Sequence, residues 1–376
     1  MNQKSIPATF MRGGSSKGLF FDANDLPLDY KNRNKIFLEA LGSPDIYGRQ
    51  LNGMGGGLSS VSKVVIINKS IREDADIDYT FAQVAVRQPK IDYSTTCGNL
   101  SAAVGPFAID SGIINAPKKN IPIRVFNTNL KHIFHAYIPT RNKMFEPNGN
   151  FSMCGVSGKG SKVCLDYINP GGTTTGKLFP TGKPTDILEV PDKGPFKVTM
   201  IDASAASVFI SSQDFTLNNS EDIFELEQKD ALMNTLEQIR RAAGVAMGIS
   251  KTMNECPLGT PKICLISEPT DFKSLSGETI LSKHFDISAR FISMGQIHRV
   301  LPVTGAMSIA AASQITGTIC NLLSKNSDEE INIGNPSGVL PVAAKVINQD
   351  NKWLIKNITV YRTARALMTG SVLIPK

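Results

Sequence analysis

The feature that most constrains the fold of this chain is a short segment that occurs twice, once in each half. Residues 97–104 read CGNLSAAV and residues 304–311 read TGAMSIAA, with Gly, Ser and an Ala at matching offsets. Each copy begins an apolar, alanine-rich run that is typical of a buried helix. The repetition predicts two similar domains. The length of 376 residues favours the same division, because a single core rarely extends over so long a chain.

Composition and charge exclude several classes of function. The chain is 41% hydrophobic and 19% charged, and its net charge of +7 is spread out, with no basic run beyond Lys118–Lys119. We therefore expect no nucleic-acid groove, whereas a mildly positive field favours a small anionic ligand. No signal peptide and no apolar run of about 20 residues is apparent. These absences predict a cytoplasmic protein without a membrane partner.

Cysteine and histidine are too few and too scattered to indicate a metal site. The six cysteines show no CxxC spacing, and the four histidines show no HExxH pattern. The sequence therefore predicts reduced cysteines, no disulfide framework, no metal and no metal cofactor.

The first copy of the repeat places a cysteine at the mouth of a helix. Residues 92–96 are expected to be extended, Cys97–Asn99 to form a turn, and Leu100–Ile109 to form the helix. Unbonded amides of a first helical turn stabilise a thiolate or a bound carboxylate. Cys97 is accordingly a candidate reactive thiol, and the alternative is a buried structural cysteine.

A lysine within an apolar strand is the second candidate. A glycine-dense loop, residues 52–60, allows the backbone to approach a ligand closely and precedes a β-branched strand over 61–67. In such a strand Lys63 shares a face with Val61 and Val65. Burial disfavours the charged ammonium form, which can make a lysine a general base near neutral pH. The alternative is a snorkelling or edge-strand lysine.

The segment 13–18, GGSSKG, is predicted to form a tight turn between two strands. Arg12 and Lys17 supply positive charge on either side of the turn, so it is either a carboxylate-binding turn or a solvated hairpin tip. It is not a phosphate loop, because the GK[ST] spacing is missing.

The remaining pattern alternates short strands with few helices. Helices are predicted over 32–41, over about 220–247 and from about 304 to 315. Strands are predicted near 79–87, 121–126, 132–138, 163–168, 196–201, 207–211, 262–266, 287–292, 339–347, 352–361 and 369–374. The Gly- and Pro-rich stretch 169–184 is the best boundary, which predicts domains 1–184 and 185–376.

Motifs along almost the whole chain resemble the PrpF family, the 2-methylaconitate cis–trans isomerases, which have the diaminopimelate epimerase-like fold. The matching segments are IPATFMRGGSSKGLFF, LNGMGGGLSSVSKVVII, DYSTTCGNLSAAVGPFAI, LFPTG, SMGQIHRVLPVTGAMSIAAAS, GNPSGVL and YRTARALMTGSVLIP. The resemblance implies an α+β fold of two similar, pseudo-symmetric domains. Each is a mostly antiparallel β-structure around a central helix, and an active-site cleft lies between them. The last strand is expected to return to the first domain.

The resemblance also implies a cofactor-independent isomerase of small unsaturated tricarboxylates, active on 2-methylaconitate in the methylcitrate cycle of propionate catabolism. The family's catalytic lysine and cysteine match Lys63 and Cys97. Thr304 stands where related epimerases carry a second cysteine, so a two-thiol racemisation is disfavoured. Further candidates for binding the substrate or stabilising its charge are Arg12, Ser15, Ser16, Gly98, Asn99, His298, Thr304, Gly305, Ser337 and Gly338.

Two other functions stay open at this point. Relatives of the same family shift a double bond in methylitaconate or oxalomesaconate, and Lys63 and Cys97 would serve either reaction. A function of another class is a non-catalytic accessory protein that binds an aconitase-like dehydratase. A homodimer is a mild preference.

Overall fold

The computed structural model describes residues 2–94, 96–293 and 296–376. Thr95, Met294 and Gly295, which belong to two of the motifs above, lie outside the described residues. The chain forms two compact units, Met1–Asp166 with Tyr361–Lys376, and Tyr167–Val360. The boundaries fall inside β12 (Val163–Ile168) and β23 (Lys352–Arg362). Each unit is described by itself, and the interdomain cleft stays a prediction.

The first unit is a mixed sheet with one helix against each face. Along the sheet the order is β24–β1–β2–β3–β4–β6–β7; β2/β3 and β4/β6 are parallel and the other neighbours antiparallel. The bounds are β1 (Gln3–Gly13), β2 (Ser16–Asp22), α1 (Tyr30–Leu41), β3 (Lys63–Lys69), β4 (Ile77–Val84), β5 (Ile91–Asp92), α2 (Ser101–Asp110), β6 (Ile123–Asn127), β7 (His132–Tyr137) and β24 (Ala364–Pro375).

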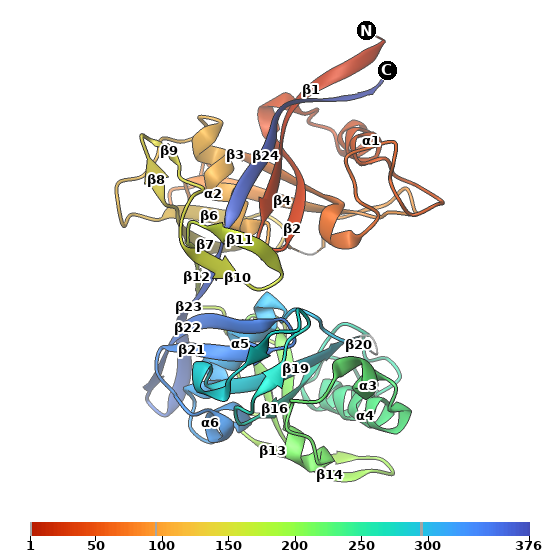
Figure 1. Ribbon diagram of the computed structural model, residues 1–376, viewed down its shortest axis with the longest axis vertical. Helices are drawn as coiled ribbons and strands as arrows, with labels where there is room; N and C mark the ends of the chain where they lie inside the picture. The colour runs from red at the N-terminus through yellow and green to blue at the C-terminus, as the bar shows by residue number, and fades with distance from the viewer. Residues whose placement is uncertain (1, 95, 294–295) are drawn as a thin grey trace. The chain divides into compact units, whose positions relative to one another are not determined.

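The helix α2 has no polar face and is buried from Ser101 to Ile109. A helix that is apolar all round must be covered on all sides, and strands of the first unit surround it (Figure 1). Phe107 packs on Phe20 of β2, with 5.6 Å between the ring centroids. The opposite face of β2 and β3 packs against α1 in a separate apolar cluster.

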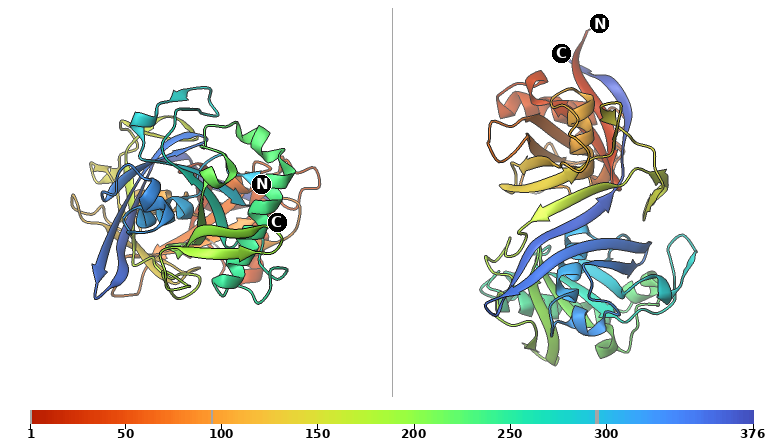
Figure 2. Two further views of the ribbon diagram at one scale, coloured as in Figure 1. Left: turned by 90° about the horizontal axis from the view of Figure 1, so that it is seen from below. Right: turned by 90° about the vertical axis from the view of Figure 1, so that its left-hand side faces the viewer.

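The last strand belongs to the first unit. β24 pairs antiparallel with β1 from Gln3↔Pro375 to Gly13↔Ala364. Figure 2 shows these two strands side by side, with both chain ends at the same end of the unit. The pairing places residues from the two ends of the sequence next to the turn that follows β1.

The second unit repeats the first. Its order is β13–β14–β15–β16–β19–β21–β22, with β15/β16 and β19/β21 parallel and the other neighbours antiparallel. The bounds are β13 (Asp186–Val190), β14 (Gly194–Asp202), β15 (Ala206–Ser211), α3 (Ile223–Glu227), α4 (Asp230–Ala246), β16 (Lys262–Ser267), β19 (Ile287–Ser293), β20 (Gln296–Ile297), α5 (Val303–Ser313), α6 (Ile319–Leu323), β21 (Glu330–Asn335) and β22 (Gly338–Gln349).

The duplicated segment takes up corresponding places in the two units. α5 is the central helix of the second unit and is buried from Gly305 to Ser313. Ser101 Oγ donates to Cys97 O over 3.0 Å, and Ser308 Oγ donates to Thr304 O over 3.1 Å. The predicted α+β class with two similar units is confirmed. Short hairpins complete the chain: β8 (Thr140–Arg141) with β9 (Met144–Phe145), β10 (Phe151–Met153) with β11 (Val156–Gly160), and β17 (Phe272–Lys273) with β18 (Thr279–Ile280).

Two sequence-based boundaries need correction. The single helix predicted over 220–247 is two helices, because Lys229 between them has non-helical backbone angles (φ −83°, ψ 78°). The domain boundary expected at residue 184 is found earlier, between Asp166 and Tyr167. The loop 169–184 belongs to the second unit because it folds onto β14. Buried Asp202 accepts hydrogen bonds from the amides of Thr174 (2.7 Å) and Thr175 (2.6 Å).

Among the residues that the structure describes, no helix combines the length and the apolar character that crossing a bilayer would require.

Replacing Asp202 with Ala should destabilise the second unit. The change removes a buried acceptor of two backbone N–H groups and of the Thr175 hydroxyl, so we expect a loss of roughly 3 kcal/mol in the free energy of unfolding, measured by urea denaturation. Glu268→Ala, at an exposed position of the same unit, is the control and should change it little. Equal stability of the two variants would contradict this role of Asp202.

Candidate active site

The tight turn predicted over 13–18 exists and is a two-residue hairpin. Gly13 pairs with Ser16, so Gly14 and Ser15 form the turn. Gly14 has φ +52°, the positive value that a type II′ turn requires at its first central position. The guanidinium of Arg12 braces the turn by donating to Gly14 O (3.0 Å) and Thr363 O (2.9 Å). Burial, and secondly the nearby charge of Arg365, lowers the pKa of Arg12.

Cys97 lies beside this hairpin, just before α2. Its side chain is 7% exposed. The sulfur accepts the N–H of Leu100 over 3.4 Å and donates to Ser16 Oγ over 3.9 Å. A backbone N–H at a helix start, aimed at sulfur, lies where negative charge is best accommodated.

The amide that reaches the sulfur is that of Leu100, whereas the sequence pointed to Gly98 and Asn99. Within the described part of the chain, the N–H groups of these two residues have no acceptor, so they stay available to a ligand. The Asn99 side chain donates to Ser15 Oγ over 3.1 Å and so ties the helix start to the hairpin.

Lys63 is the first residue of β3, and its ammonium end is held in place. Nζ donates to Gln83 Oε1 over 2.9 Å and lies 5.0 Å from the centre of the Phe81 ring. The amide nitrogen of Gln83 donates to Ser59 O (3.1 Å) and Ser62 O (3.0 Å). Because these bonds orient the amide, its oxygen faces Lys63.

The predicted strand over 61–67 therefore starts two residues late. Val61 lies in a short 3-10 helix, Ser59–Val61, so Lys63 shares a strand face with Val65 but not with Val61. Gln83, which the sequence analysis missed, is its partner. The only signal for Gln83 in the sequence is that a polar residue interrupts the apolar run of the next strand. To recognise it as the partner of Lys63 one must know how the two strands pair, residue by residue.

Glycines of the hairpin allow it to touch both candidate residues. Gly18 lies opposite Lys63 in the parallel β2/β3 pair, and a Cβ there would overlap the Lys63 backbone. A Cβ at Gly13 would lie 2.7 Å from Asn99 O and 2.9 Å from Leu100 Cα, closer than atoms pack. The hairpin thus brings Lys63 and the Cys97 turn to one place in the first unit.

The glycine-dense loop 52–60 packs closely against the chain's own backbone; its approach to a ligand stays a prediction. Its glycines approach the chain's own backbone: Gly53 lies against Gly42, and Gly57 (φ +73°) against Gly48. Gln50 accepts the Gly57 N–H over 2.9 Å and the Ser62 hydroxyl over 2.5 Å. These contacts therefore hold in place the segment that leads into β3. The glycines approach other parts of the protein's own backbone.

The other five predicted residues lie in the second unit. Thr304 and Gly305 are in the first turn of α5, and Gly305 packs against the Phe291 ring. Ser337 lies in the turn between β21 and β22, and Gly338 is the first residue of β22. There Ser337 Oγ donates to Arg299 O over 2.6 Å, and Gly338 O accepts the Asn335 side-chain amide over 2.9 Å.

His298 is half-buried and neutral near pH 7. Burial, and secondly the charge of Lys262, lowers its pKa to about 4. Its Nε2 is buried without a hydrogen-bond partner among the described residues. As a neutral imidazole it can donate or accept one hydrogen bond there, but it supplies no charge.

Two of the other cysteines, Cys264 and Cys320, are fully buried. None of the six is in a disulfide bond. Burial raises the pKa of the Cys264 and Cys320 thiols well above the usual value, so both are inert structural groups. Within residues 2–94, 96–293 and 296–376, no group of three His, Cys, Asp or Glu side chains could hold a metal ion.

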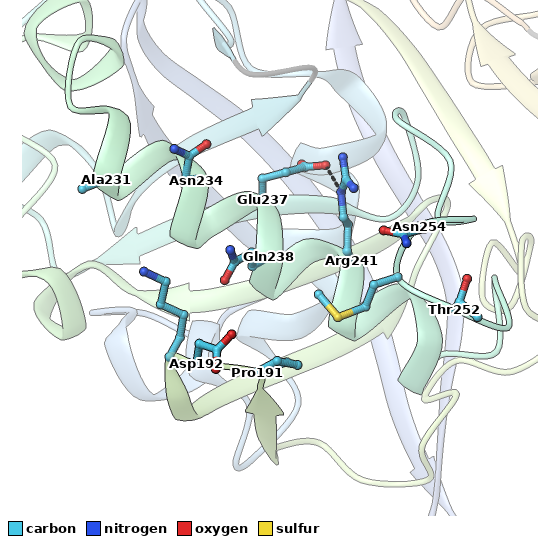
Figure 3. Close-up of a pocket in the computed structure, with 11 residues that line it drawn as sticks. Pro191, Asp192, Ala231, Asn234, Glu237, Gln238, Arg241, Thr252 and Asn254 are labelled. Atoms are coloured by element: carbon cyan, nitrogen blue, oxygen red, sulfur yellow. Dashed lines mark hydrogen bonds and ion pairs between the residues drawn. The ribbon is translucent and has the colours of Figure 1, made fainter.

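A separate pocket of about 740 Å³ lies in the second unit between α4 and the β13/β14 turn. Figure 3 shows Glu237 pointing toward Arg241, and their ion pair is 2.7 Å long. Glu237 is also paired with Arg240 over 2.7 Å. None of the predicted site residues lines this pocket, so we do not assign the chemistry to it.

Comparison with known proteins identifies the family of this chain. The family model described as PrpF protein matches residues 3–375. The chain belongs to the PrpF family. It is 36% identical over 388 residues to the 2-methyl-aconitate isomerase of Shewanella oneidensis, covering 100% of this chain and 98% of that relative.

Solved structures place this PrpF chain in its fold. The crystal structure of methylitaconate-delta-isomerase matches with a TM-score of 0.91 and 33% identity, covering 100% of this chain and 97% of the other. A hydroxyproline epimerase from Agrobacterium vitis matches with a TM-score of 0.52 and 11% identity over 99% of this chain and 93% of the other, which shows the epimerase-like fold alone. The protein is an isomerase, as its relatives are.

Replacing His298 with Gln should flatten the acid side of the stability profile. An unfolded histidine has a pKa of about 6.5, against about 4 in the folded chain, so the unfolded state binds a proton first. The stabilisation is present above pH 6.5 and is lost as the pH falls toward 4. Between pH 7.5 and pH 5 the free energy of unfolding in urea should therefore fall less in His298→Gln than in the wild type. His284→Gln, at an exposed position, should follow the wild type, and parallel curves for all three proteins would contradict the assignment.

Proposed function

We propose that this protein interconverts the cis and trans forms of 2-methylaconitate by proton removal, bond rotation and reprotonation. The observation that carries the proposal is the hairpin that contacts both Lys63 and the turn of Cys97. One helix start with open amides adjoins the same hairpin, as an anionic substrate requires. The 2-methyl-aconitate isomerase relative supports the choice of substrate.

The first step is loss of an acidic proton from the carbon next to the conjugated alkene. Lys63, in its neutral form, accepts this proton at Nζ and becomes an ammonium. The electron pair spreads over the former double bond into a carboxylate, so that bond gains single-bond character and rotates. Gln83 Oε1, 2.9 Å from Nζ, keeps the lysine aligned and accepts a hydrogen bond from the ammonium.

The second step returns a proton to the carbanion and fixes the new geometry. Either the Lys63 ammonium gives its proton back, or the Cys97 thiol donates one and the thiolate that remains takes up the proton of the Lys63 ammonium through solvent, so that both side chains end as they began. The N–H groups of Gly98 and Asn99 are available to stabilise the negative charge while it exists. No net proton or electron is gained or lost, so the reaction needs no co-reactant.

A second candidate reaction follows from the same carbanion. If the proton returns to the original carbon, the product is the cis–trans isomer; if it returns to the far end of the allylic system, the double bond has moved. The similarity to methylitaconate-delta-isomerase favours this allylic shift as the alternative. The position of reprotonation distinguishes the two.

Replacing Lys63 or Cys97 with Ala should each reduce turnover by several orders of magnitude, because each removes a group that transfers the proton. Product formation from 2-methylaconitate, methylitaconate and oxalomesaconate is followed by proton NMR of the purified full chain. In deuterium oxide the product should carry deuterium at the reprotonated carbon, which identifies the reaction.

Matched controls separate this loss from unfolding. Lys69→Ala removes an exposed lysine at the other end of β3, and Cys154→Ala removes the half-buried thiol between β10 and β11; both should keep wild-type turnover. If Lys63→Ala or Cys97→Ala converted all three acids at a near-normal rate, the result would contradict the proposed mechanism. Cis–trans turnover without a double-bond shift supports the first candidate, and the reverse supports the second.

Gln83→Leu should lower kcat about 10- to 100-fold while leaving the fold intact, because Nζ loses the acceptor that aligns it with the substrate. Steady-state kinetics with the acid that the wild type turns over best is the measurement. Gln88→Leu, at an exposed position beyond β4, is the control. An unchanged kcat in Gln83→Leu would show that the hydrogen bond to Lys63 plays no part in turnover.

A further inference from the structure

The second unit contains a counterpart of Lys63 that the sequence analysis did not single out. Lys262 begins β16, as Lys63 begins β3, and the two strands hold the same position in the two repeated sheets. Lys63 lies opposite Gly18 in a parallel pair, and Lys262 lies opposite Ser207 in the corresponding parallel pair. The topology therefore relates the two lysines.

The neighbouring register agrees with this correspondence. Two residues after Lys63, Val65 faces Phe81 across the antiparallel β3/β4 pair. Two residues after Lys262, Cys264 faces Phe291 across the antiparallel β16/β19 pair. Because side chains alternate along a strand, Lys262 shares the face of Phe291, on which α5 packs through Gly305.

The surroundings of Lys262 differ from those of Lys63 in one respect. Lys63 has Gln83 as its acceptor, whereas within the described residues no hydrogen bond or ion pair engages the Lys262 ammonium. Burial alone lowers the pKa of Lys262. Among the residues that the structure describes, no acidic side chain therefore compensates the charge of this half-buried lysine.

Burial, and secondly the charge of Lys262, lowers the pKa of His298. His298 follows β20, and its N–H donates to Phe291 O over 2.8 Å, so it adjoins the same phenylalanine. Its Nε2 is buried without a partner among the residues described. Lys262 and His298 are thus two neighbouring polar groups, each without the compensation that burial normally demands.

An anion that accepts hydrogen bonds would satisfy both groups at once. A carboxylate has two oxygens, one for the ammonium and one for a neutral imidazole N–H. We propose that Lys262 and His298 form a carboxylate-binding subsite in the second unit, for one carboxylate of a small polycarboxylate. The choice of a polycarboxylate rests on the proposed function.

Comparison of the two units also indicates whether the subsite binds charge or transfers a proton. The second unit has Thr304 where the first has Cys97, so it lacks a thiol that could exchange protons. In the described part of the chain, Lys262 has no aligned amide acceptor of the kind that Gln83 provides for Lys63. A lysine that binds charge, rather than one that moves a proton, is what these surroundings favour.

The test measures binding of propane-1,2,3-tricarboxylate, a saturated acid that cannot isomerise, to the full chain by isothermal titration calorimetry at pH 7.5. Lys262→Met keeps the length of the side chain and removes its charge, so it should weaken binding at least about tenfold. Lys262→Arg keeps the charge and should restore most of the affinity. His298→Phe should weaken binding by a smaller factor, because it removes a neutral hydrogen bond.

Lys197→Ala, which removes an exposed lysine from β14 in the same unit, is the matched control for charge and should bind like the wild type. Urea unfolding of every variant identifies any loss that comes from misfolding. If Lys262→Met misfolds, the affinities of His298→Phe and Lys262→Arg for the tricarboxylate test the subsite instead, because both variants keep a side chain of similar bulk.

Affinity of Lys262→Met within twofold of the wild type would overturn the subsite, as would failure of the wild type to bind the tricarboxylate. These outcomes are distinct from failure of the proposed function, which is judged by turnover of the three unsaturated acids by the wild type. A wild type that turns over 2-methylaconitate, together with an unaffected Lys262→Met, overturns the subsite alone.

Discussion

The burial of α2 and α5 on every side is the constraint on which the rest of this structure depends. Neither helix has a polar face, so each must be covered all round, and a curved sheet of strands provides that cover. Backbone polar groups without intrahelical partners occur only at the ends of such a helix, and its start is the end that offers N–H groups. The fold therefore concentrates the chemistry of each unit at the beginning of its central helix.

In the first unit, close backbone packing turns this helix start into an organised site. Gly13 and Gly18 lack the Cβ that would collide with Leu100 and with the backbone of Lys63. The hairpin between them can therefore touch both candidate proton-transfer residues. Gln83 adds alignment, because its amide nitrogen is already bound to backbone carbonyls and only its oxygen faces the lysine. This alignment matters because even a small displacement of a reacting group lowers the reaction rate strongly.

The two units have kept their topology and diverged in chemistry. The same order and direction of strands surrounds α2 and α5, and the serine bond to the carbonyl four residues earlier is present in both. The first unit pairs a cysteine with a lysine that has an amide acceptor. The second has a threonine, a lysine without a described partner and a neutral histidine. In the proposed scheme, the first unit moves protons and the second binds charge.

The sequence predicted the two similar units, the central helices and the hairpin at 13–18 from local periodicity, turn residues and an internal repeat, and it predicted the α+β class through the resemblance of its motifs to a known family. It also singled out Lys63 and Cys97 as candidates, since a lysine in a β-branched run and a cysteine at a helix start are visible locally. The tertiary structure alone decided the partners. Gln83 opposite Lys63 and Lys262 opposite Ser207 depend on strand register, which joins residues far apart in the chain. The loop 169–184 was misassigned for the same reason, because the residue that holds it, Asp202, is distant in sequence and buried only after folding.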